Sequence, residues 1–92
     1  TNIKSVKYEV TGTSGLVSIT IYNSTGGIEQ FNDVTTPWNK TINMKDGFMY
    51  VSAQNQRDRG SVKVKIYVDG DLVKESSSEG EYCIATASDM LK

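Results

Sequence analysis

The sequence predicts an all-β domain, an antiparallel sandwich of seven to eight short strands. Val, Ile and Thr make up 25 of the 92 residues, whereas Leu and Ala together make up six, and branched side chains favour strands over helices. Apolar and polar residues alternate along most of the chain. Turn residues recur about every ten positions, which is the spacing of a sandwich. Residues 1–92 are therefore expected to form a single β-sandwich domain.

Eight segments have this alternation and are bounded by turn-forming residues. In the second segment the apolar side chains share one face, and Tyr22 lies on the opposite face. The strongest two-residue hairpin signal, Asp46-Gly47, connects the fourth and fifth segments, and residues Ser88–Lys92 are expected to form a short tail. The predicted strands are Val6–Val10, Val17–Tyr22, Ile28–Val34, Trp38–Met44, Phe48–Gln54, Val62–Val68, Leu72–Ser76 and Tyr82–Ala87.

Composition excludes several kinds of chemistry. The chain has no His and one Cys, which excludes a His-based catalytic triad, a zinc site of the usual Cys/His kind and an internal disulfide. We therefore predict no catalytic residue, no cofactor and no metal site, and an enzyme is the least favoured class. The net charge of -1 argues against nucleic-acid binding, because phosphate neutralisation needs a basic surface.

Five side chains are candidate contacts for a partner: Tyr22, Arg57, Arg59, Lys63 and Tyr67. The two tyrosines lie opposite inward-facing apolar residues, and Tyr provides interface area at a small entropic cost. Lys63 shares the outward stripe of Tyr67, and the two arginines can bind a carboxylate or phosphate bidentately. The alternative interpretation is a solvated strand face and a simple ion pair within the loop.

Trp38 and Cys83 are interpreted as structural residues. Trp38 is in phase with Ile42 and Met44, which indicates a plug of the sandwich core, although an exposed binding anchor is the alternative. Cys83 lies in an apolar strand without a neighbouring His, as expected of a buried cysteine that acts as a small hydrophobic residue.

Several local patterns, in this order, resemble one family: the MmpS transport accessory family of small mycobacterial membrane proteins, in its extracytoplasmic domain. The likeness spans nearly the whole chain. The segments that carry it are Val6–Gly12, Val34–Trp38, Val51–Gln54, Ile66–Gly70 and Tyr82-Cys83.

The resemblance implies a non-enzymatic immunoglobulin-like sandwich in the periplasm or cell envelope, anchored through a segment upstream of Thr1. It implies a membrane-associated protein partner, such as an exporter of lipids or siderophores, or a lipophilic cargo. Domains of this family resemble each other in having two cysteines that can form a disulfide. The first falls on Val64 here and the second on Cys83, so these residues are expected to meet in the core without a covalent link.

Two alternatives belong to other classes of function. One is a secreted adhesin or glycan-binding module, in which Trp38 and the tyrosines stack on sugar rings; a solvent-exposed Trp38 beside a Tyr would favour it. The other is a purely structural spacer domain, which the absence of an apolar surface patch would favour.

Overall fold

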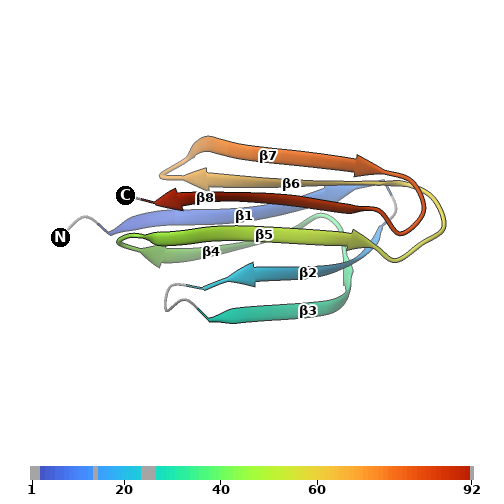
Figure 1. Ribbon diagram of the computed structural model, residues 1–92, viewed down its shortest axis with the longest axis horizontal. Helices are drawn as coiled ribbons and strands as arrows, with labels where there is room; N and C mark the ends of the chain where they lie inside the picture. The colour runs from blue at the N-terminus through green and yellow to red at the C-terminus, as the bar shows by residue number, and fades with distance from the viewer. Residues whose placement is uncertain (1–2, 14, 24–26, 92) are drawn as a thin grey trace.

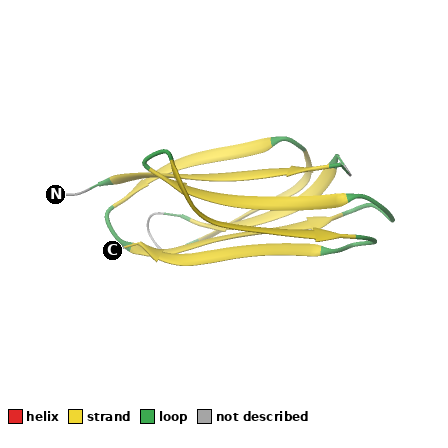
Figure 2. Ribbon diagram, turned by 90° about the horizontal axis from the view of Figure 1, so that it is seen from above, coloured by secondary structure: helices red, strands yellow, loops and turns green. Residues whose placement is uncertain are grey.

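The eight predicted strands are present in the computed structural model, which describes residues 3–13, 15–23 and 27–91. The described residues contain strands, turns and loops but no helix (Figure 2). The strands are β1 (Lys4–Gly12), β2 (Leu16–Tyr22), β3 (Ile28–Thr35), β4 (Trp38–Met44), β5 (Gly47–Asn55), β6 (Ser61–Val68), β7 (Asp71–Glu79) and β8 (Ile84–Leu91).

The strands form two stacked antiparallel sheets. The first sheet has the order β4-β1-β6-β7 and the second sheet the order β3-β2-β5-β8 (Figure 1). The prediction of an all-β sandwich is confirmed. Each strand runs along the long axis, so the turns gather at the two ends of the molecule. One end holds the start of β1 and the end of β8 together with the end of β2, the start of β3 and the β4–β5 and β6–β7 connections (Figure 1).

Among the strands that the structure describes, two pairs of consecutive strands form hairpins. β2 pairs with β3 and β6 pairs with β7, and in the β6–β7 turn Asp69 and Gly70 both have positive φ, 50° and 88°, as a type I′ turn requires. The predicted hairpin at Asp46-Gly47 is wrong, because β4 belongs to the first sheet and β5 to the second. This dipeptide reverses the chain, but it does not determine the pairing partner of the next strand: β5 pairs with β2 and β8 rather than with β4.

The inward faces of both sheets share one apolar core. Side chains alternate along each strand as in β1, where Val6, Tyr8 and Val10 are fully buried and the residues between them are not. Burial of apolar area at about 25 cal/mol per Å² is the main force that holds the two sheets together. The buried apolar residues are Val6, Tyr8, Val10, Val17, Ile19, Ile21, Met44, Met49, Val51, Ala53, Val62, Val64, Ile66, Ala85, Ala87 and Leu91.

The C-terminal segment differs from its prediction. Cys83 precedes β8 and is only partly buried, although it packs against the core cluster that contains Val64. The expected tail from Ser88 is wrong, since β8 continues to Leu91, which is 6% exposed and pairs with Gly47. Ser88 and Asp89 interrupt the apolar alternation of this segment in the sequence. The strand continues through them because they pair with Tyr50 and Met49 of β5. Lys92 lies outside the described residues.

An ion pair joins the two sheets along the edge formed by β3 and β4. Lys40 Nζ of β4 lies 2.8 Å from Glu29 Oε1 of β3 and 5.4 Å from the centre of the Phe31 ring. Trp38 also contacts Phe31, with 5.3 Å between ring centres. Trp38 is half-buried, lies on the inward side of β4 and packs against the core cluster at this edge. Lys40 occupies an inward position here because its ammonium group is paired.

The pKa of Glu29 lies below its ordinary value because the Lys40 ammonium and the Asn23 amide donate hydrogen bonds to its carboxylate. On acidification the Glu29 carboxylate takes up a proton near pH 4.5 in the unfolded chain, whereas in the folded chain it remains ionised to a lower pH. The stabilisation is therefore complete above this pH and is lost as the pH falls through the folded pKa.

We expect Glu29→Gln to lower the free energy of unfolding by a constant amount between pH 5 and 7, and by progressively less below about pH 4.5. Urea unfolding measured across this pH range checks the effect. Glu75→Gln on β7 is the control for the loss of a carboxylate. A difference between wild type and Glu29→Gln that grows on acidification contradicts the assignment.

Candidate functional site

The outward side of the second sheet is almost free of charge. Over the described lengths of its four strands the charged residues are Glu29, Asp33 and Asp89. Glu29 and Asp89 pair with the inward-facing Ile21 and Met49, so both occupy inward rather than outward positions. Asp33 lies in an irregularity of the β2–β3 register and has a φ of 56°. We call the remaining outward surface the neutral face. Its residues are Leu16, Ser18, Thr20, Tyr22, Ile28, Gln30, Asn32, Thr35, Phe48, Tyr50, Ser52, Gln54, Ile84, Thr86, Ser88 and Met90.

The outward side of the first sheet has the opposite character. Glu9 of β1 lies across from Lys65 of β6, and Lys65 lies across from Glu75 of β7. Such alternating charges on neighbouring strands suit a solvated surface. The sandwich thus has one charged face and one neutral face, and the neutral face is the better candidate for a contact surface, because the cores of protein interfaces are depleted of charged residues.

Three aromatic rings pack against one another at one end of the neutral face. The Tyr22 ring lies 5.2 Å from Phe48 in an edge-to-face arrangement and 5.4 Å from Tyr50. Ile28 and Met90 extend this group across β3 and β8, because they pair with Tyr22 and Phe48 in the strand registers. We call these five residues the aromatic end.

Tyr8 holds the aromatic end from beneath. The β2–β5 register ends at Ile21 opposite Val51, and just beyond it the Tyr8 hydroxyl donates to the Tyr22 carbonyl (3.1 Å) and accepts from the Tyr50 amide (3.4 Å). A fully buried side chain of the first sheet therefore joins two strands of the second. Burial raises the pKa of the Tyr8 hydroxyl, which the bond from Tyr50 partly offsets.

The structure separates the five predicted contact residues. Tyr22 belongs to the neutral face, whereas Lys63 and Tyr67 lie on the opposite, charged face, where Lys7 stands 5.6 Å from the Tyr67 ring. Arg57 and Arg59 lie in the loop between β5 and β6. The five residues therefore do not form one surface. The sequence pattern predicts that a side chain points outward, but it does not predict to which of the two sheets that side chain belongs.

The Arg57–Arg59 loop contains the expected local ion pair. Arg59 Nε lies 3.8 Å from Asp58 Oδ1, and both side chains are exposed, at 90% and 76%. An ion pair this exposed contributes little to stability.

Asn55 fixes the backbone of the same loop. It is the buried polar residue at the end of β5, and its amide Nδ2 donates to the carbonyls of Arg59 and Gly80, both at 3.0 Å. Its Oδ1 accepts from the Arg57 amide (2.9 Å), and its backbone amide donates to the Cys83 carbonyl (2.8 Å). One side chain thus ties the β5–β6 loop to the β7–β8 turn.

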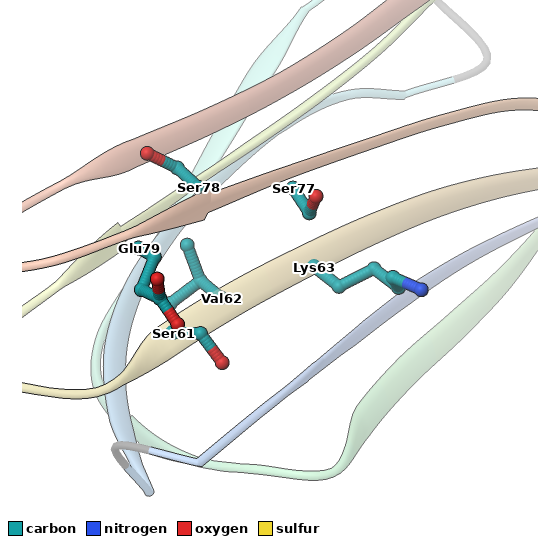
Figure 3. A pocket seen from close by; sticks show the side chains of 6 residues that line it. All are labelled: Ser61, Val62, Lys63, Ser77, Ser78 and Glu79. Atoms are coloured by element: carbon teal, nitrogen blue, oxygen red, sulfur yellow. The ribbon is translucent and has the colours of Figure 1, made fainter.

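A shallow hollow of about 410 Å³ lies over β6 and β7 (Figure 3). Its lining consists mainly of hydroxyl groups, with one ammonium and one carboxylate, and contains no aromatic ring on which a sugar or base can stack. Lys63 belongs to this hollow, which places it away from the aromatic end. The lining residues are Ser61, Val62, Lys63, Ser77, Ser78 and Glu79.

The fold and this surface define a β-sandwich domain whose candidate site is a contact face. Among the described residues no three His, Cys, Asp or Glu side chains are grouped to hold a metal ion. In the same part of the chain, no helix has the length and apolar character needed to cross a bilayer.

The sequence model of the family described as Mycobacterium membrane protein matches residues 1–89. The chain therefore belongs to this family of MmpS-like mycobacterial membrane proteins, which is not a known enzyme family. A comparison with curated proteins gives no match.

Most of the aromatic end and the whole Asn55 network were not predicted from the sequence. Alternation in the fifth segment places Phe48 and Tyr50 opposite the apolar Met49 and Val51, so their outward direction was available from the sequence. Their contact with Tyr22 was not, because it depends on the pairing of β2 with β5.

We expect Tyr8→Phe to lower the free energy of unfolding by about 1–2 kcal/mol, since it leaves a carbonyl and an amide without their partner. Chemical denaturation measures the loss. Tyr82→Phe, at an exposed tyrosine, removes a hydroxyl without this effect. Equal stabilities of the two variants would show that the bridge contributes nothing.

Asn55→Ala is expected to destabilise the fold by about 3 kcal/mol, because three backbone groups lose their hydrogen-bond partner on this buried side chain. Thermal or urea unfolding checks this value. Asn39→Ala, at an exposed position of β4, is the matched control. A loss below about 0.5 kcal/mol for Asn55→Ala would contradict the role given to this network.

Proposed function

We propose that this chain is an extracytoplasmic accessory domain of a membrane transport system and binds a membrane-associated protein, such as an exporter, through the neutral face. The observation that carries the proposal is the division of charge between the two faces. Removing a charged group from water is expensive, so a partner covers the neutral face at a much lower cost than the Lys- and Glu-rich face. Family membership supports a role at the membrane.

The dimensions of the domain are compatible with such an interface. The molecule measures 45 Å by 22 Å along its two longest axes, and a standard protein interface buries roughly 800 Å² on each partner. The neutral face also combines aromatic residues and Met at one end with uncharged polar residues over the rest. These uncharged polar side chains can exchange hydrogen bonds with a partner without the cost of removing a charge from water.

The two alternative functions receive less support. Trp38 is half-buried beside Phe31 at the start of β4, whereas Phe48 lies near the start of β5, at the opposite end of the sandwich (Figure 1). Trp38 and the aromatic end are therefore placed too far apart to stack on the same sugar. A pure spacer has no use for the exposed Ile28, Phe48 and Met90, which lie together on one face.

We expect Thr86→Lys to abolish binding to the exporter partner, because it inserts an unpaired charge into the neutral face. Thr41→Lys is the matched control: both threonines are exposed and lie on edge strands, but Thr41 belongs to the first sheet. Co-purification of each full-length variant with the exporter measures binding. Retained binding by Thr86→Lys together with loss of binding by Tyr67→Ala would place the contact on the charged face instead.

A further inference from the structure

The aromatic end exposes large apolar side chains that a protein surface normally covers. Ile28 is 58% exposed, Met90 55% and Phe48 38%. They lie on β3, β8 and β5, and Tyr22 and Tyr50 connect them, so the apolar surface extends across all four strands of the second sheet. Contiguous exposed apolar surface of this kind marks contact sites for proteins or membranes.

Most of the other exposed apolar side chains lie at the same end of the molecule as the aromatic end. Ile3, Leu72 and Val73 are 65%, 46% and 39% exposed, and they lie at the end of the sandwich that holds the aromatic end (Figure 1). Among the described residues, Tyr82 and Ile84 are the exposed large hydrophobic residues of the opposite end. Apolar exposure is thus concentrated at one end of the domain and drawn from both sheets.

We propose that the aromatic end is a lipid contact site that rests on the interfacial region of a phospholipid bilayer. Tyr and Phe side chains favour the boundary between headgroups and acyl chains, where an aromatic ring is half in an apolar medium. The outward positions of the aromatic end form one face of a sheet without a charged residue, which suits an extended lipid surface. Membership of a membrane-protein family places such a surface within reach of the chain.

The charges beside the aromatic end favour a zwitterionic bilayer over an anionic one. The turn next to Phe48 contains Lys45 and Asp46, the β6–β7 connection at the same end contains Asp69, and Asp71 begins β7. Such a mixture has no excess of positive charge to attract anionic headgroups. Apolar insertion therefore supplies the binding, and its strength should depend little on ionic strength.

This inference rests on the proposed function in one respect, since both treat the neutral face as a contact surface. It adds that the aromatic end meets lipid, while the part of the face halfway along the strands, around Thr86 on the edge strand β8, meets the protein partner. The two contacts are separable because each has its own variants and its own assay.

The experiment is flotation of the purified chain with phosphatidylcholine vesicles at millimolar lipid. We expect wild type to float with the vesicles and Met90→Ser to partition about tenfold more weakly. Ile84→Ser is the matched control, because Ile84 lies on the same strand and face with the same 55% exposure, at the other end of β8. Phe48→Ser serves as a second variant if Met90→Ser does not fold.

Tryptophan fluorescence locates the contact. In Trp38→Phe/Phe48→Trp the emission should shift to the blue on vesicle addition and be quenched by brominated lipid, whereas Trp38 in wild type should not respond. Absence of flotation, equal losses in Met90→Ser and Ile84→Ser, or binding to anionic vesicles alone overturns the lipid site. If lipid binding fails while Thr86→Lys still abolishes exporter binding, the proposed function stands without it.

Discussion

The insertion of the Tyr8 hydroxyl between β2 and β5 is the interaction on which the architecture of this domain depends. Apolar burial brings the two sheets together, but it is not directional and leaves their relative position to other contacts. Tyr8 supplies direction, because its hydroxyl bonds Tyr22 and Tyr50 from the opposite sheet at 3.1 and 3.4 Å. The position of the aromatic end on the outside is thereby coupled to the packing of the core inside.

Two further polar contacts secure the sandwich away from its centre. The Glu29–Lys40 pair joins β3 to β4 along one edge, and Asn55 joins the β5–β6 loop to the β7–β8 turn at the end opposite the aromatic end. Glu29 and Lys40 are partly exposed, whereas Asn55 is fully buried and bonds to backbone groups of both connections. A hydrogen-bonded polar side chain satisfies the backbone there, since buried polar groups without partners are costly.

Much of the fold was predictable because strand alternation is a local property. The eight strands, the inward direction of Val64 and the outward direction of Tyr22 follow from the period of two. The hairpin expected at Asp46-Gly47 and the tail expected at Ser88 failed for one reason: whether β4 pairs with β5, or Leu91 with Gly47, depends on segments far apart in the chain. The predicted contact surface was not found for a similar reason: the alternation along a strand does not show which of the two sheets an outward residue belongs to.

The sequence by itself determined the strand-forming character of this chain, the faces of its strands and, through the order of its motifs, its family. These follow from side-chain branching, the pleat and neighbouring residues, all of which act over a few positions. The tertiary structure alone decided that Tyr22, Phe48 and Met90 lie together, that the charges gather on one face, and that Asn55 and Tyr8 tie distant segments. Those outcomes depend on which strands pair, and pairing is settled by long-range burial of apolar surface rather than by local sequence.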